Sequence, residues 1–109
     1  MSLLSRHCTA NAPALSHEEI AALLPQVPGW AVIDGKLQSS FAFRNYYETI
    51  AFVNAMAWVS HQEDHHPELL VGYKLCAVAY TTHTAADVSL NDFICAARVS
   101  ALYVQRAGQ

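Results

Sequence analysis

The sequence predicts an α+β domain in which a four-stranded antiparallel sheet carries three helices packed on one face. Three observations lead to this fold class. Helical and extended patterns follow one another in the order α-β-β-α-β-β-α, short turns join the paired strands, and 109 residues suffice for one core but not two. We therefore expect a flexible N-terminal arm over residues 1–15 and a single domain over residues 16–107.

Capping and turn residues mark the first helix and the first pair of strands. Ser16 and Glu19 have the spacing of a capping box, which predicts a short helix ending near Leu24, before two prolines. Residues 30–33 have the composition of a strand, and the Asp34–Gly35 pair that follows is typical of a two-residue hairpin turn. Apolar residues then alternate along the returning strand, as expected if one face is buried.

A longer middle helix is predicted from Asn45, with Glu48 completing its cap, to about Asp64. This helix is apolar nearly all round, with one stripe at Ile50, Val53 and Ala57 and another at Phe52, Met56 and Val59. A single sheet can bury only one of these stripes. We therefore expect a subunit interface to cover the other, in a homodimer or homotetramer.

Two further strands and a last helix complete the domain. Residues 69–71 and 75–82 are predicted to pair through a turn at Gly72, and the second of them is apolar on both faces, as in a central strand. Ser89 and Asp92 then have the spacing to begin the last helix. Its buried face is expected to consist of Phe93, Ala97, Ser100 and Val104.

Composition excludes several classes of partner. The net charge is -3 and the chain has only six lysines and arginines, too few to neutralise a nucleic-acid backbone, so we expect no nucleic-acid partner. No apolar run approaches the length of a membrane span, and we expect no membrane partner. The three cysteines form no C-x-x-C pair or disulfide framework, which indicates a reducing compartment and a cytoplasmic location.

The informative feature of the sequence is a cluster of histidines. His61, His65 and His66 precede Pro67, and His83 follows at the end of a strand. Helical spacing would place His61 and His65 on one face if the helix persisted that far. Histidine ordinarily titrates near neutral pH, so several imidazoles around one pocket can both donate and accept protons.

At this point the chain from Phe43 to Leu102 resembles the pterin-4a-carbinolamine dehydratase family. The residues that carry the resemblance are His61, His65, His66, Pro67, Tyr73, His83 and Asp92, which occur at the family's intervals. The resemblance implies dehydration of 4a-hydroxytetrahydrobiopterin to quinonoid dihydrobiopterin, in the recycling of tetrahydrobiopterin used by an aromatic amino acid hydroxylase. It implies a pterin substrate and no cofactor.

The resemblance also implies roles for individual residues. His65 and His83 would be the acid/base pair and His66 would hold the substrate or share the proton transfer. Asp64, Thr81 and Thr82 would contact the substrate, the threonines through the backbone of their strand. The supporting residues are ambiguous: His61 either orients His83 or only solvates the end of its helix, and Asp92 either orients a histidine or only caps its helix.

A metal site is not predicted. His61 and His65 are four residues apart, but Glu63 does not directly follow the first histidine, as the H-E-x-x-H zinc motif requires. Two departures from the family affect the pocket: Ala86-Asp87 stands where relatives have Gly-Gly, and Leu69 stands where an aromatic is frequent. We expect the turn at Ala86 to have a different backbone shape from the family's.

Two rival functions remain from the sequence alone. The chain could act as a dimerisation or assembly module without catalysis, or it could keep the fold and act on a different pterin, such as one in molybdopterin metabolism.

Overall fold

The computed structural model describes residues 2–107, with side chains through residue 105, and has the element order that the sequence predicts. The elements are α1 (His17–Leu23), β1 (Ala31–Ile33), β2 (Lys36–Ala42), α2 (Tyr46–Glu63), β3 (Glu68–Val71), β4 (Leu75–Tyr80) and α3 (Leu90–Ala107). Short 3₁₀ turns lie at Leu3–Ser5, Leu24–Gln26 and His83–Ala85. The predicted α+β class is confirmed.

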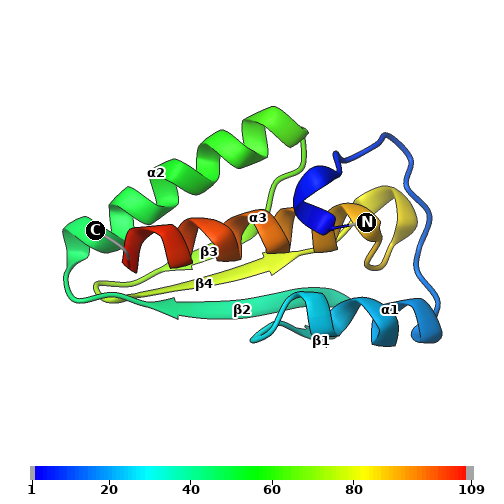
Figure 1. The fold of residues 1–109 in the computed structure, drawn as a ribbon, viewed down its shortest axis with the longest axis horizontal. Helices are drawn as coiled ribbons and strands as arrows, with labels where there is room; N and C mark the ends of the chain where they lie inside the picture. The colour runs from blue at the N-terminus through cyan, green and yellow to red at the C-terminus, as the bar shows by residue number, and fades with distance from the viewer. Residues whose placement is uncertain (1, 108–109) are drawn as a thin grey trace.

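The sheet is antiparallel throughout, in the order β1-β2-β4-β3. Asp34 and Gly35, with φ of 51° and 73°, form the hairpin turn between β1 and β2 as predicted. Strand β4 is central and pairs with β2 on one side and β3 on the other, so its end at Tyr80 lies deep in the molecule. The chain that leaves this end therefore emerges close to the N-terminus of α3 (Figure 1).

Helices α2 and α3 lie side by side across one face of the sheet, while α1 lies near the β1 edge (Figure 1). The core between the sheet and these helices is built from Phe52 and Met56 of α2, Phe93 and Val99 of α3, and apolar residues of β2 and β4. Val104, which we expected on the buried face of α3, is 69% exposed. In this turn of α3 the neighbouring Tyr103 is the residue that faces the sheet, packing on Phe41 and donating its hydroxyl to the Ala42 carbonyl at 2.7 Å.

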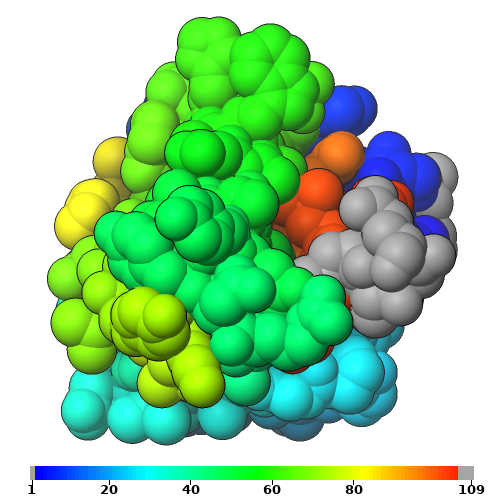
Figure 2. All heavy atoms as spheres, turned by 90° about the vertical axis from the view of Figure 1, so that its left-hand side faces the viewer, coloured from blue at the N-terminus to red at the C-terminus, as the bar shows by residue number. Residues whose placement is uncertain are grey.

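The α2 stripe of Phe52, Met56 and Val59 is buried, whereas the stripe of Ile50, Val53 and Ala57 is only partly covered within one chain. Trp58 and Tyr47 are exposed, and every residue of the edge strand β3 is exposed, with Leu70 reaching 75%. Tyr73, in the turn after β3, stacks on Tyr46 of α2 rather than entering the core. Figure 2 shows α2 and the β3–β4 turn forming one continuous face of the molecule.

The segment before Ser16 lies against α2 and α3. Leu3 is buried in the core, the Arg98 guanidinium donates to the carbonyl of Arg6 at 2.6 Å, and the Cys8 amide donates to Glu63 at 2.8 Å. The expected flexibility of residues 1–15 concerns motion and stays a prediction. The position of the arm is set by backbone groups of Arg6, Cys8, Thr9 and Leu15 that form hydrogen bonds with the domain.

Two further expectations concern disulfides and membrane spans. Cys8, Cys76 and Cys95 are all free thiols, and the Sγ atoms of Cys8 and Cys95 lie 3.6 Å apart. Within residues 2–107, none of the helices combines the length and the apolar character needed to cross a bilayer.

Candidate active site

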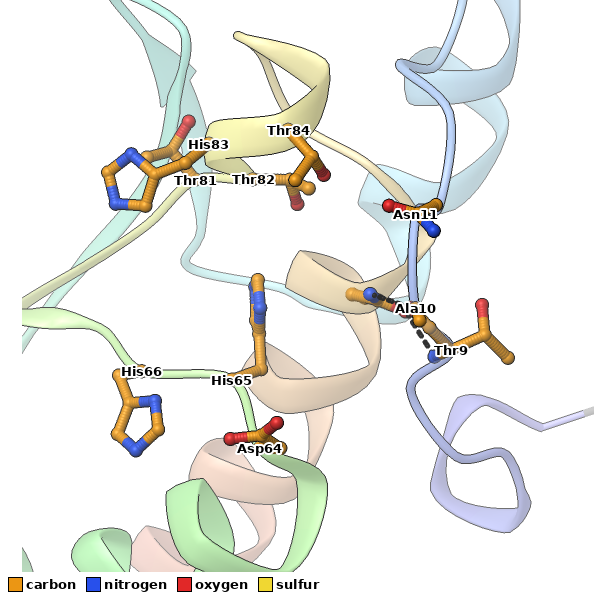
Figure 3. Close-up of a pocket in the computed structure, with 11 residues that line it drawn as sticks. Thr9, Ala10, Asn11, Asp64, His65, His66, Thr81, Thr82, His83 and Thr84 are labelled. Atoms are coloured by element: carbon orange, nitrogen blue, oxygen red, sulfur yellow. Dashed lines mark hydrogen bonds between the residues drawn. The ribbon is translucent and has the colours of Figure 1, made fainter.

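A hollow of about 290 Å³ opens at the junction of α2, β4 and α3, where three distant stretches of chain meet (Figure 3). This volume is close to the lower end of about 300 Å³ that is usual for small-molecule sites. Its lining consists of Thr9, Ala10, Asn11, Asp64, His65, His66, Thr81, Thr82, His83, Thr84 and Asn91. All three predicted catalytic histidines and all three predicted substrate-binding residues therefore surround one hollow.

The corner after α2 explains why the side chains of the adjacent His65 and His66 point in different directions. Asp64 adopts a left-handed conformation, with φ of 50°, and its amide still donates to the Ser60 carbonyl. This residue ends the helix, and Pro67 restricts the residue before it to an extended conformation. His65 and His66 thus leave the helix as extended chain, in which successive side chains point to different sides.

His65 is held by a buried carboxylate. Its Nε2 lies 2.6 Å from Oδ1 of Asp92, which is 0% exposed, and its ring stacks on Tyr80 with centroids 5.7 Å apart and planes 9° from parallel. Burial raises the pKa of the Tyr80 hydroxyl, so this ring stays a neutral platform. With Nε2–H donated to Asp92, the Nδ1 of His65 keeps its lone pair and can accept a proton.

Asp92 has both of the roles that the sequence left open. Its Oδ2 accepts from the Ser89 amide at 2.8 Å at the start of α3, which is a capping contact, while Oδ1 contacts His65. The same Oδ2 also accepts from the Thr82 hydroxyl at 2.8 Å. One carboxylate thus joins the helix start, the end of β4 and the histidine corner.

His66 and His83 are the exposed members of the group. Neither ring forms a hydrogen bond with another residue in the described part of the chain, so both are available to a ligand. His83 begins the 3₁₀ turn after β4, close enough for its charge to help lower the pKa of Glu68, although the hydrogen bond and charge of Lys36 are the larger causes.

The two threonines line the hollow but bond mainly within the protein. The Thr82 amide donates to the Asp87 carbonyl at 3.1 Å, its carbonyl accepts from Ala85 at 3.0 Å, and its hydroxyl is used by Asp92. The Thr81 hydroxyl donates to the Gly35 carbonyl at 2.9 Å. Thr82 therefore positions Asp92, and the substrate contact expected of its amide would require the bond to Asp87 to open.

His61 is not part of this pocket. It lies on the outer side of α2, its ring 5.5 Å from that of Trp58, beside a separate hollow of about 540 Å³ that Glu63 and Arg98 also line. The helix ends at Glu63, so the expected shared face of His61 and His65 is never formed. We considered a role for His61 in orienting His83, but no contact between these two residues is found in the described part of the chain.

Sequence reasoning missed the other side of the pocket. Asn91 and three consecutive arm residues, Thr9 to Asn11, line it, as does Thr84. Asn91 adjoins Asp92 and could have been suspected from that position. The arm carries no periodic pattern, and nothing in its sequence indicates where it docks.

The turn at Ala86 and Asp87, where the sequence departs from the family, contains a left-handed residue. Ala86 has φ of 56°, a conformation that glycine adopts without strain and alanine does not. The Asp87 side chain then accepts from the Val88 amide at 2.7 Å, which fixes the approach to α3. Alanine at this position therefore raises the energy of the turn without abolishing the left-handed residue.

No group of three or more histidine, cysteine, aspartate or glutamate side chains in the described part of the chain could hold a metal ion. What the pocket offers is a set of neutral or protonatable imidazoles, one of them oriented by a carboxylate. Such a set can donate one proton and accept another on the same ligand.

Comparison with known proteins gives concordant matches. Residues 13–102 match the sequence profile of the family described as "Pterin 4 alpha carbinolamine dehydratase". A protein of Nitrosomonas eutropha, provisionally named a pterin-4-alpha-carbinolamine dehydratase, is 53% identical over 89% of this chain and 87% of its own. One of Nitrosospira multiformis with the same provisional name is 51% identical over 88% and 85%.

Two solved structures are similar as well. A transcriptional coactivator/pterin dehydratase from Brucella melitensis is 26% identical, with a TM-score of 0.80 over 83% of this chain and 98% of that one. A pterin dehydratase-like protein described as a RuBisCO assembly factor in the α-carboxysome is 28% identical, with a TM-score of 0.58 over 68% of this chain and 86% of that one.

Proposed function

Because this chain belongs to the pterin 4 alpha carbinolamine dehydratase family, we propose that it dehydrates 4a-hydroxytetrahydrobiopterin to quinonoid dihydrobiopterin by histidine acid/base catalysis. The observation that carries the proposal is the convergence of His65, His66 and His83 on one hollow, with His65 held 2.6 Å from the buried Asp92.

The reaction requires two proton transfers and no change of oxidation state. One imidazole protonates the hydroxyl on C4a, the C–O bond breaks, and water leaves. A second imidazole takes the proton from N5, and the electrons of the N–H bond form the C4a=N5 double bond. Oriented acid and base groups of this kind contribute about 10²- to 10⁴-fold each.

The hydrogen bond of His65 supports separate roles for the histidines as base and acid. His65, with Nε2–H donated to Asp92, presents a basic Nδ1 and is assigned the N5 proton. His83 is assigned the proton donated to the leaving hydroxyl, and the exposed His66 holds the substrate or shares that transfer. Asp64 at the corner lines the same hollow and is assigned to substrate binding.

The proposal is tested by following the absorbance decay of 4a-hydroxytetrahydrobiopterin generated in solution. We expect wild-type protein to accelerate the decay, and His65→Ala and His83→Ala each to lower kcat at least about tenfold. His61→Ala is the matched control, because it removes the same side chain four residues away and outside the pocket, and its kcat should match wild type. No acceleration by wild-type protein would overturn the proposal.

We also propose that the product returns to the tetrahydrobiopterin pool of an aromatic amino acid hydroxylase, in a reducing compartment such as the cytoplasm. The three free thiols support the compartment, because disulfides persist mainly in oxidising ones. Recycling would be supported if adding the protein to a hydroxylase assay prevents the accumulation of the 4a-hydroxy intermediate.

A second role in assembly is favoured by the exposed edge of β3. This edge strand pairs only with β4, and its leucines and valine face solvent in one chain. An exposed apolar edge strand can pair with the edge of another chain, and we assign a second copy of this chain to it. Sedimentation should show a dimer or tetramer that Leu70→Lys dissociates, whereas a monomeric wild type would exclude this surface as a self-association site.

A further inference from the structure

The N-terminal arm supplies one wall of the pocket from outside the part of the chain that the family profile matches. The profile begins at residue 13, whereas Thr9, Ala10 and Asn11 line the hollow together with the histidines. This wall therefore lies outside the segment that the profile describes. It faces the hollow that the proposed reaction uses.

The arm is fixed to residues that adjoin the histidine corner and Asp92. The Thr9 amide donates to Asn91 Oδ1 at 3.0 Å, and the Asn91 side chain donates back to the Thr9 carbonyl at 2.8 Å. Asn91 immediately precedes Asp92. Glu63, which accepts from the Cys8 amide at 2.8 Å, immediately precedes Asp64. The position of the arm is thus tied to both halves of the site.

Asn11 lies between two anchored points of the arm. On one side is Thr9, and on the other Leu15 donates to the Val88 carbonyl at 3.0 Å. Asn11 itself has φ of 58°, a left-handed conformation that asparagine tolerates better than most residues. Its side-chain amide makes no hydrogen bond with any other residue of the described chain, so its donors and acceptor remain free at the wall of the hollow.

The layout of the pocket assigns a direction to a bound ligand. In Figure 3, His66 and His83 lie on one side of His65 and the arm residues lie on the other. A pterin whose reacting carbon is close to the histidines therefore reaches toward the arm with another part of the molecule. The proposed substrate carries a short chain with two hydroxyl groups, which can both donate to and accept from an amide.

We propose that the arm selects the substrate by this side chain, with the Asn11 amide binding its hydroxyl groups and Thr9 lining the same wall. The inference rests on the proposed function for the identity of the ligand. Its consequence is that pterins with a polar side chain bind more tightly than pterins with a methyl group in the same place.

The variant that tests this is Asn11→Gly. Glycine keeps the left-handed backbone and removes only the amide, whereas alanine would also strain the turn. Binding is measured by fluorescence titration with 7,8-dihydrobiopterin and with 6-methyl-7,8-dihydropterin, which differ only in the side chain. Asn54→Ala, an exposed asparagine on α2 outside the pocket, is the matched control.

We expect wild-type protein to favour dihydrobiopterin, and Asn11→Gly to reduce that preference about three- to tenfold, the effect of one or two neutral hydrogen bonds. Asn54→Ala should keep the full preference. In the turnover assay, Asn11→Gly should raise KM for 4a-hydroxytetrahydrobiopterin and leave kcat unchanged, because the amide contacts no reacting atom.

Docking of the arm is followed separately, through the 3.6 Å approach of the Cys8 and Cys95 sulfurs. A small-molecule disulfide should oxidise the pair to a protein disulfide, releasing two equivalents of its thiol and lowering the protein mass by two hydrogens. Cys8→Ser cannot form the link. Equal rates of cross-linking in wild type and Asn11→Gly would show that the glycine variant keeps the arm docked.

Each outcome decides the inference. Equal affinity of wild type for the two pterins, binding of neither, or an unchanged preference in docked Asn11→Gly would overturn it. Failure of the proposed function is a different result, in which both pterins bind with the expected preference and the 4a-hydroxy compound is not dehydrated.

Discussion

Two buried carboxylates, Glu63 at the end of α2 and Asp92 in the first turn of α3, each contact a histidine, but the two histidines lie in different surroundings. Asp92 holds His65, which is 13% exposed, stacked on Tyr80 and set in the wall of the hollow. Glu63, 4% exposed, holds His7, which is 77% exposed and lies on the outer surface. The first pair lies beside the hollow, whereas the second fastens the arm that forms the opposite wall.

The comparison teaches that a carboxylate–histidine contact alone does not make a histidine a candidate for catalysis. What distinguishes them is the surroundings of the histidine: the ring of His65 is fixed by Tyr80 and Asp92 together, whereas that of His7 is fixed on one edge only. Glu63 has other partners, with the Cys8 amide at 2.8 Å and the Arg98 guanidinium at 3.9 Å, which make it an anchor for the chain.

The largest expected effect is a loss of kcat when Asp92, but not Glu63, is replaced by its amide. Asp92→Asn keeps the shape of the side chain but removes the charge that orients His65, and kcat for dehydration should fall about a hundredfold, within the range known for partners that orient a catalytic group. Stopped-flow absorbance measures this. Far-ultraviolet circular dichroism is the control for folding, and a kcat within twofold of wild type would show that the two clusters do not differ as described.

The next effect is on stability. Glu63→Gln leaves Arg98 without its charge partner and weakens the bonds to the arm, so the free energy of unfolding should fall by about 1–3 kcal/mol while kcat changes less than twofold. Urea unfolding monitored by far-ultraviolet circular dichroism gives the value. A loss of activity as large as that of Asp92→Asn would place Glu63 in the catalytic group instead.

The same anchor predicts a pH dependence. Burial tends to raise the pKa of Glu63, but the bonds from the Cys8 amide and His7 and the charge of Arg98 outweigh it and hold the pKa below its ordinary 4.5. The contribution of Glu63 to stability is therefore complete above about pH 4.5 and is lost as pH falls through the lowered value in the folded protein.

Urea unfolding of wild type and Glu63→Gln at a series of pH values checks this directly. The difference between the two proteins should shrink as pH falls below about 4.5. A difference that stayed constant into strong acid would mean that the Glu63 carboxylate does not carry the anchor.

The smallest effect concerns a position outside both clusters. Ala86→Gly relieves the left-handed alanine near the pocket and should raise the free energy of unfolding by about 1 kcal/mol, with kcat unchanged. Ala85→Gly, one residue earlier in the 3₁₀ turn, serves as the control and should destabilise instead. Stabilisation by both would contradict the account of the strained residue.

Much of the fold could be predicted because local signals and the global arrangement agree. Ser16 and Glu19 form the predicted capping box, Asn45 caps α2 through the Glu48 amide, and the Asp34–Gly35 turn has positive φ at both residues. Each signal depends on residues within four positions of one another, which is the range in which sequence dictates backbone. The prediction that Val104 is buried was wrong, because Tyr103 rather than Val104 packs against the sheet in the last turns of α3.

The site could be predicted only in part, for the same reason. His65, His66 and His83 were found through their clustering and their resemblance to a family, and they line one hollow. The corner at Asp64 separated His61 from them, because one left-handed residue decides which side chains share a face. The contacts of the arm with the pocket were not predicted, because the partners of the arm lie 55 to 92 residues away in the sequence.

That separation has a consequence for synthesis. The arm leaves the ribosome first, but the residues that receive it at positions 91, 95 and 98 are made near the end of the chain. A nascent polypeptide can therefore build its hairpin and α2 while the arm is still unattached. The arm can reach its full set of partners only when α3 has been made, so a chain shortened before that helix would keep Glu63 of α2 as an anchor for the arm but lack the contacts of residues 91, 95 and 98.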